Sequence, residues 1–178
     1  MKRIHTSLAA ILSIAFLSIF ISSISSCSAE TPLRGEVIRV TDGDTVVIEP
    51  EKGGKNITCR LYGIDSPETE KRDRRGQPYA KEAAEELKKL ILGQQVEVAT
   101  TGEKTHNRDV CIIRNNGMDI NREMIKRGYA WAYRKHLESP YASEYIEAEN
   151  EARVQRSGIW RQANPLPPWE FKKKYWNK

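Results

Sequence analysis

The sequence is poor in the side chains that usually bind transition metals, with three cysteines and three histidines in 178 residues. It has no Cys-x-x-Cys pair and its histidines are scattered, which excludes a zinc site of the common thiolate–imidazole kind. It also has no internal repeat, and no low-complexity tract apart from one apolar run near the N-terminus. These absences leave a chain with about one domain's worth of sequence.

The N-terminal segment has the pattern of an export signal. Lys2 and Arg3 precede an almost charge-free apolar run, Leu8 to Ile24, which ends in small residues. This layout is typical of a signal peptide. A retained transmembrane anchor is the alternative, because the run is about long enough to span a bilayer, but its serines make it weakly hydrophobic. We predict an export signal over residues 1–27, followed by a short linker, residues 28–34.

The end of the apolar run indicates lipidation. Ile24-Ser25-Ser26-Cys27 resembles a bacterial lipobox, in which a lipidated cysteine becomes the new N-terminus, although Gly or Ala is commoner than serine before the cysteine. The alternative is ordinary cleavage at Ala29, which would give a secreted protein. The sequence predicts a chain anchored through Cys27 to the membrane, on the periplasmic face of the cell envelope.

The charge balance is compatible with several kinds of partner. The net charge is +5, and removal of residues 1–27, which hold two basic residues and no acidic one, leaves +3. A modest positive excess permits a polyanionic partner without requiring one. A solubilising surface explains the same excess, so charge does not decide between these functions.

Hydrophobic patterning predicts a mixed α+β domain over residues 35–162. Alternating apolar residues and turn signals predict strands, at residues 35–40, 45–49, 57–64, 95–99 and 108–114. Helical periodicity, caps and glycine stops predict about three helices: from Pro78 to Gly93, from Asn121 as N-cap to Arg127, and from Ser139-Pro140 to Ser157-Gly158. This order is expected of a five-stranded Greek-key β-barrel of the OB type, which offers a groove for nucleic acid.

Two segments outside these elements are basic. The segment from Glu70 to Gly76 contains no apolar residue and is predicted to be a solvated loop. The C-terminal tail, residues 163–178, holds Trp169, Phe171 and Trp176 among lysines. We expect these aromatic side chains to dock the tail onto the barrel; base stacking is the alternative.

Three acids and two arginines lie near predicted strand ends. The acids are Asp44, Asp65 and Glu68, and the arginines are Arg60 and Arg108. Phosphodiester hydrolysis needs a base that takes a proton from water and positive charge around the phosphoryl oxygens. Carboxylates can hold a hard divalent ion, and arginines can grip oxygens with planar forks. This set of residue types therefore predicts phosphate chemistry.

One condition on this site follows from strand geometry. Arg60 and Asp65 are an odd number of residues apart, so on a regular strand they would face opposite sides. They can share a site only if the strand bends or ends between them. Gly63 and the Ser66-Pro67 break allow this.

The motifs resemble those of the thermonuclease (staphylococcal-nuclease-like) family. The sequence has Asp42-Gly43-Asp44-Thr45, then Arg60-Leu61 followed by Asp65-Ser66-Pro67-Glu68-Thr69, then Arg108 after a polar turn. Later landmarks, Gly128-Tyr129-Ala130 and Gly158-Ile159-Trp160, are similar as well. The resemblance implies an OB barrel with three helices and calcium-dependent cleavage of DNA and RNA that leaves 3′-phosphates.

The resemblance also implies roles for individual residues. The calcium ligands would be Asp44, Asp65 and the main-chain carbonyl of Ser66, with Asp42 beside the metal pocket. The general base would be Glu68, and the phosphate-binding side chains would be Arg60 and Arg108. Tyr133 would lie near the nucleotide.

The approach to the second arginine departs from the family pattern. The family's Asp-x-Tyr-Gly-Arg is here Lys104-Thr105-His106-Asn107-Arg108. Asn107 can replace glycine in a left-handed turn with modest strain. The missing tyrosine removes a substrate contact, for which His106 is a candidate replacement, although a solvated turn residue is the simpler interpretation of His106.

Cys59 and Cys111 are candidates for a disulfide. They would be the two cysteines left beside a lipidated Cys27 in an exported protein, where pairing is favoured. Each lies on a predicted strand close to one of the two arginines. We predict a bridge between these strands.

The leading interpretation is an exported, monomeric, calcium-dependent nuclease that acts on DNA and RNA. The main alternative is a catalytically inactive barrel of the same fold that binds nucleic acid or a protein partner. Both arginines and all three acids are present at the motif positions, which favours the enzyme.

Overall fold

The computed structural model describes residues 32–176. The predicted export signal and its alternatives, including lipidation at Cys27, lie outside the described residues. Within residues 32–176, no helix combines the length and the apolar character needed to cross a membrane.

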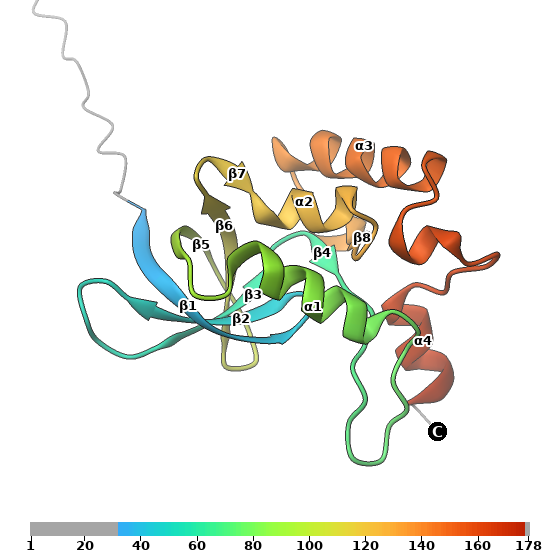
Figure 1. The fold of residues 1–178 in the computed structure, drawn as a ribbon, viewed down its shortest axis with the longest axis horizontal. Helices are drawn as coiled ribbons and strands as arrows, with labels where there is room; N and C mark the ends of the chain where they lie inside the picture. The colour runs from blue at the N-terminus through green and yellow to red at the C-terminus, as the bar shows by residue number, and fades with distance from the viewer. Residues whose placement is uncertain (1–31, 177–178) are drawn as a thin grey trace, which may run out of the picture. The chain divides into compact units, whose positions relative to one another are not determined.

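Five strands close into a barrel (Figure 1). They are β1 (Leu33–Asp42), β2 (Thr45–Pro50), β3 (Ile57–Leu61), β5 (Gln95–Thr105) and β6 (Arg108–Asn115). Neighbouring strands pair antiparallel in the order β3-β2-β1-β5-β6, and a parallel pairing of β3 with β6 closes the barrel. The fold is therefore the predicted OB-type barrel with helices.

Three two-residue strands complete the sheets. β7 (Met118–Asp119) extends the end of β6, and β4 (Ile64–Asp65) pairs with β8 (Trp131–Ala132) in a small second sheet. The predicted third strand, residues 57–64, is thus interrupted after Leu61. None of β4, β7 and β8 was predicted as a separate strand, because two residues are too few for a periodic pattern.

The core fills the barrel and extends under the helices. Alternate residues of the barrel strands point inward, and Val37, Val46, Ile48, Leu61 and Ile113 are all at most 1 % exposed. This alternation is expected of strands that have one face on a core and one toward solvent. Burial of these large aliphatic side chains stabilises the barrel through the hydrophobic effect.

Helix α1 (Ala80–Ile91) covers one flank of the barrel with the predicted apolar stripe. Ala83, Leu87 and Ile91 on this stripe are fully buried. Gly93 follows the helix in a left-handed conformation, with φ of 72°, as expected of a C-terminal glycine cap. The helix prediction is confirmed.

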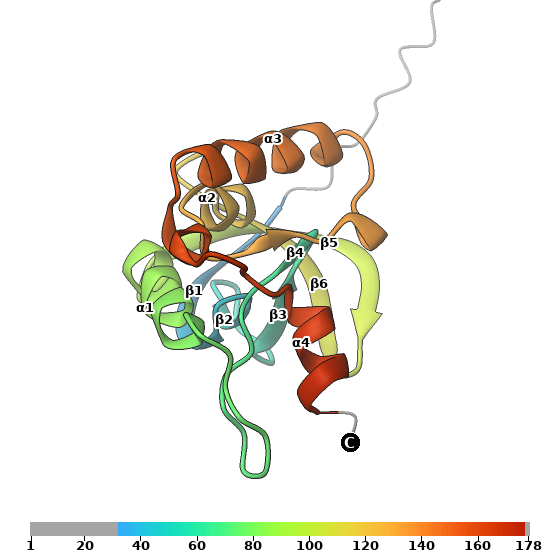
Figure 2. The same ribbon diagram turned by 90° about the vertical axis from the view of Figure 1, so that its right-hand side faces the viewer.

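Helices α2 (Ile120–Lys126) and α3 (Tyr141–Val154) pack against each other beside the barrel (Figure 2). The predicted N-cap of α2 was wrong: Asp119, not Asn121, accepts a hydrogen bond from the amide of Arg122, at 3.0 Å. Asn121 is buried and bonds three barrel groups instead, because a buried amide needs partners. The prediction for α3 was also inexact, since Pro140, with no side-chain cap, occupies the N-cap position assigned to Ser139.

Tyr145 of α3 ties this helix to the start of α2. Its side chain is fully buried, and its hydroxyl donates to the carboxylate of Asp119 at 3.0 Å. Burial, together with the negative charge of Asp119, raises the pKa of Tyr145 well above its usual value. The hydroxyl therefore remains a neutral donor, which stabilises the pairing of the two helices.

The C-terminal tail contains a fourth helix, α4 (Pro168–Tyr175), where three helices were expected. Phe171 is 2 % exposed, and the ring of Trp169 lies 5.4 Å from that of Tyr133. The tail therefore docks through its aromatic side chains, as expected. The loop after β4 runs beside α4 (Figures 1 and 2), where the indole of Trp176 donates to the carbonyl of Arg75 at 3.2 Å.

Candidate active site

A cavity of about 590 Å³ lies where β3, the β1–β2 turn, the β5–β6 hairpin and α4 meet. The charged residues singled out from the sequence line it together: Asp42, Asp44, Arg60, Asp65, Glu68 and Arg108. His106 and Tyr133 also line the cavity, whereas Ser66 is buried just behind Asp44. The six charged residues, which are up to 66 positions apart in the sequence, thus meet at one opening.

The β1–β2 turn presents Asp44 to the cavity. The carboxylate of Asp42 accepts a hydrogen bond from the amide of Asp44, at 3.1 Å, which fixes the tight turn. Asp44 is 3 % exposed, and it accepts further bonds from the Thr45 hydroxyl at 3.1 Å and the Ser66 amide at 2.8 Å. Asp42 therefore acts on the turn and holds Asp44 in place.

A bend between β3 and β4 brings Arg60 and Asp65 together. β3 ends at Leu61, and Gly63 adopts φ of 70°, which reverses the chain. A Cβ on Gly63 would lie 2.6 Å from the side chain of Leu137, so this position favours glycine doubly. The chain thus bends between Arg60 and Asp65, which their odd spacing required if the two side chains were to share a site.

Arg60 is the central cation of the site. Its guanidinium contacts the carboxylate of Asp44, and it donates to Asp65 at 2.5 Å and to the carbonyl of Ile64 at 3.3 Å. Both carboxylates are nearly fully buried, and Arg60 neutralises them. A planar fork suits this double contact, which lysine could not reproduce.

Arg108 reaches the same network from β6. Its guanidinium donates to the hydroxyl of Thr45 at 3.2 Å, and this hydroxyl bonds Asp44. Within residues 32–176, no ion pair joins Arg108 to its neighbour Asp109, whose carboxylate lies 3.3 Å from the ammonium of Lys104. Both arginines therefore face the cavity that contains the three acids.

The turn before Arg108 differs from the expectation in one detail. His106, with φ of 57°, occupies the left-handed position that was assigned to Asn107. Histidine is among the residues found more often than most at such positions. The turn still directs Arg108 inward, and it places His106 at the edge of the cavity.

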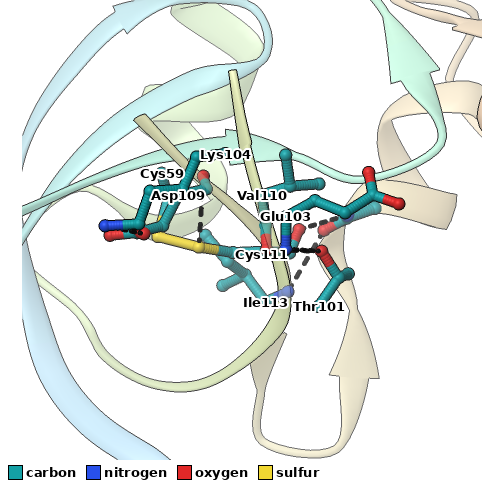
Figure 3. The surroundings of a disulfide bond; sticks show 9 residues. Cys59, Thr101, Glu103, Lys104, Asp109, Val110, Cys111 and Ile113 are labelled. Atoms are coloured by element: carbon teal, nitrogen blue, oxygen red, sulfur yellow. Dashed lines mark hydrogen bonds and ion pairs between the residues drawn. A yellow bond between two sulfur atoms is a disulfide. The ribbon is translucent and has the colours of Figure 1, made fainter. Parts of the chain in front are cut away.

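A disulfide joins β3 to β6 close in sequence to the two arginines, and Figure 3 shows its surroundings. Cys59 precedes Arg60 on β3, and Cys111 follows Arg108 on β6; their Cα atoms are 5.6 Å apart and their sulfurs are bonded. This separation is within the range that a disulfide spans. Both cysteines are fully buried, so the bridge joins the parallel strand pair that closes the barrel.

Comparison with known proteins identifies the family. Residues 58–162 match the family model described as staphylococcal nuclease homologue, which is more than half of the chain. The chain belongs to the staphylococcal nuclease family. The matched range contains Arg60, Asp65, Glu68 and Arg108, whereas Asp44 lies before it.

The chain is similar to bacterial and plant relatives. It is 30% identical over 157 residues to an uncharacterized endonuclease of Haemophilus influenzae, covering 88% of this chain and 82% of the relative. It is 30% identical over 177 residues to a micrococcal nuclease of Shigella flexneri, covering 94% and 95%. It is 39% identical over 119 residues to the staphylococcal-like nuclease CAN1 of Arabidopsis thaliana, covering 67% of this chain and 34% of the relative.

The donor set fits a hard divalent cation of the kind that this family implies. Asp44 and Asp65 are buried, and both contact the one guanidinium of Arg60, so their oxygens lie close together. The main-chain carbonyl of Ser66, the residue after Asp65, would be the further ligand that the resemblance implies. Within residues 32–176 there is no cluster of three or more His, Cys, Asp or Glu side chains that could hold a metal ion. Main-chain oxygens and water would complete the oxygen shell that calcium takes.

Sequence reasoning missed two residues of the site, Lys172 and Gln77. The ammonium of Lys172 lies 2.7 Å from Glu68 and 3.6 Å from Asp65. Gln77 holds the backbone of Glu68, because its amide donates to the Glu68 carbonyl at 2.8 Å and its side chain accepts from the Glu68 amide at 3.2 Å. The only sequence signal for Lys172 was its place among the lysines of the basic C-terminal tail.

Tyr133 lies between the cavity and the C-terminal segment. Its ring packs against His136 at 5.3 Å and against Trp169 at 5.4 Å between centroids. Tyr133 and His136 therefore form an aromatic wall of the cavity, whereas Trp169 packs on Tyr133 without lining it. Such a wall is suited to a base or sugar next to a bound phosphate.

Proposed function

We propose that this member of the staphylococcal nuclease family is a calcium-dependent nuclease that hydrolyses DNA and RNA to products ending in 3′-phosphates. The observation that carries the proposal is the continuous charged network around one cavity. Consecutive hydrogen bonds and ion pairs link five residues of this network, in the order Arg108, Thr45, Asp44, Arg60 and Asp65. An acid that can serve as base, Glu68, lines the same cavity.

Glu68 takes the proton from the attacking water in this mechanism. Its side chain is 15 % exposed, so it reaches the cavity while most of it is shielded. Its backbone is fixed by Gln77 through two hydrogen bonds. A general base in a fixed position contributes about 10²- to 10⁴-fold to the rate.

Arg60 and Arg108 bind the phosphoryl oxygens. They extend from two different strands, so they can approach one phosphate from two sides, where charge develops in the transition state. Calcium bound by Asp44, Asp65 and the Ser66 carbonyl would neutralise the phosphate anion and orient it. Arg60 also pairs with both carboxylates, so it balances their charge beside the phosphate.

Tyr133 and His106 both line the cavity and are proposed to contact the nucleotides that flank the cleaved bond. Contacts of this kind to sugar and base faces tolerate many sequences. Phosphate contacts likewise carry no sequence information. The site therefore fits a nuclease without strong sequence preference.

A nuclease assay on the purified chain from residue 28 to residue 178 tests the proposal. With calcium we expect cleavage of DNA and RNA, and with excess chelator we expect none. The product ends should carry 3′-phosphates, which mass spectrometry of a short labelled oligonucleotide detects. Tight binding of the oligonucleotide without cleavage would instead support the alternative, an inactive binding module.

We further propose that the protein is exported as a monomer and anchored through a lipidated Cys27. One acyl chain binds a membrane only weakly, whereas several chains on one cysteine anchor it stably. The protein should fractionate with membranes, and Cys27→Ala should release it or leave it unprocessed. A mature N-terminus at Glu30 without lipid mass would establish secretion instead.

A further inference from the structure

The C-terminal helix contributes a charged group to the active site. Lys172 of α4 places its ammonium 2.7 Å from Oε1 of Glu68 and 3.6 Å from Oδ2 of Asp65. Glu68 and Lys172 are 104 positions apart in the sequence, and the pair is partly buried. Neither contact involves Arg60 or Arg108, and Lys172 is the cation that contacts Glu68.

The attachment of α4 makes this contact specific. Phe171, next to Lys172, is buried, which fixes the rotation of the helix about its axis. The side chain of Gln77 donates to the carbonyl of Leu166 at 2.6 Å, and the same side chain holds the backbone of Glu68. One residue therefore connects the segment before α4 with the candidate base.

The far end of α4 is held by the basic loop after β4. The indole of Trp176 donates to the carbonyl of Arg75, and the guanidinium of Arg74 lies 5.1 Å from the centre of the Trp176 ring. The guanidinium of Arg75 in turn lies 4.5 Å from the centre of the Tyr175 ring. With both ends of the helix held, Lys172 faces the cavity.

Among residues 32–176, the carboxylate of Glu68 has one hydrogen-bond partner, the ammonium of Lys172. Within residues 32–176, the hydrogen bond from Lys172 engages Oε1, and Oε2 has no hydrogen-bond donor from the protein. A glutamate has three rotatable bonds, and its carboxylate must be held in place for it to act on one water molecule. An ammonium that binds one oxygen restricts the side chain and leaves the other oxygen for the water.

We propose that Lys172 is the positioning residue for Glu68 and that α4 is therefore a functional part of the active site; this inference rests on the proposed function. Lys172 acts through Glu68 and not on the phosphate. Loss of Lys172 therefore lowers the rate of the chemical step and leaves substrate binding nearly unchanged.

The first experiment compares Lys172→Met with a matched control, Lys173→Met, which removes the same charge from an exposed neighbour on the same helix. We expect kcat of Lys172→Met to fall roughly 10- to 100-fold, because a displaced base loses alignment with water. KM, and the affinity for a non-cleavable phosphorothioate oligonucleotide, should change less than about twofold. Lys172→Arg should recover part of the rate, and Lys173→Met should resemble the wild type.

A double-mutant cycle with Glu68→Gln separates positioning from phosphate binding. If Lys172 acts only through Glu68, adding Lys172→Met to Glu68→Gln should lower the rate less than about twofold further. An equal loss in both backgrounds, or weaker oligonucleotide binding by Lys172→Met, would overturn the proposal in favour of a phosphate contact. A Lys172→Met rate equal to that of Lys173→Met would overturn it in favour of a purely structural helix.

Two controls keep these results interpretable. Thermal unfolding of each variant identifies any loss that comes from detachment of α4, and Lys172→Gln provides a second, polar replacement. If the wild type does not cleave nucleic acid, the proposed function fails. If the wild type is active and Glu68→Gln is not, while Lys172→Met keeps the wild-type rate, only the inference about Lys172 fails.

Discussion

The bridge between Cys59 and Cys111 should contribute several kcal/mol to stability. It closes a loop between residues 52 positions apart, and in the chain-entropy model a loop of this size stabilises the folded state by about 4 kcal/mol. For a domain of this length, 1 kcal/mol corresponds to about 2–4 °C in the unfolding midpoint. Reduction of the bridge should therefore lower the midpoint by about 8–16 °C.

The measurement is thermal unfolding of the oxidised and reduced wild type, with free thiols counted to verify each state. The reduced wild type isolates the effect of the cross-link, because it keeps both sulfur atoms in the core. Cys59→Ala/Cys111→Ala should unfold at a still lower temperature, since it also leaves unfilled volume where two buried side chains were. A midpoint lowered by less than about 3 °C would refute the loop-closure argument for this bridge.

Three other predictions concern the two arginines, the proposed metal ligand Asp44 and a glycine. Arg60→Lys and Arg108→Lys should each lower kcat/KM roughly a hundredfold, because a point charge does not reproduce a planar fork; a change below about threefold in steady-state rates would contradict the assigned contacts. Asp44→Ala should weaken calcium binding in isothermal titration, since a hard ion loses a charged ligand; unchanged affinity would remove Asp44 from the metal site. Gly128→Ala should destabilise the fold by at least about 1–3 kcal/mol in urea unfolding, because φ is +76° and the new Cβ would lie 2.3 Å from the carbonyl oxygen of Ser157; wild-type stability would show that the backbone there relaxes freely.

The barrel could be predicted from the sequence because its signals are local. Alternation of apolar residues and the position of Gly63 each depend on a few neighbouring residues, whereas the turn expected at Asp42-Gly43 lies one residue later, at Gly43 and Asp44. The bend between Arg60 and Asp65 followed from the same reasoning, since their odd spacing required it. The structure confirms the interruption of the strand at this point.

The features that the sequence did not reveal depend on tertiary contacts. The contact of Lys172 with Glu68 depends on how α4 docks, which no local pattern encodes. Asparagine is a residue type that often caps helices. Asn121 is instead buried, where its side chain forms hydrogen bonds with backbone groups of the barrel. Thr105 pairs with Arg108, so His106 and Asn107 both occupy the turn, and the left-handed residue is His106 and not Asn107.

The most direct test of the active site is the single-turnover rate of Glu68→Gln on DNA in saturating calcium, compared with that of the wild type. The substitution keeps the size of the side chain and removes its ability to accept a proton, so the fold should be retained by circular dichroism. We expect the rate to fall by at least about a hundredfold, the usual scale for loss of a general base. Cleavage by Glu68→Gln at the wild-type rate would contradict the assignment of Glu68 as the base.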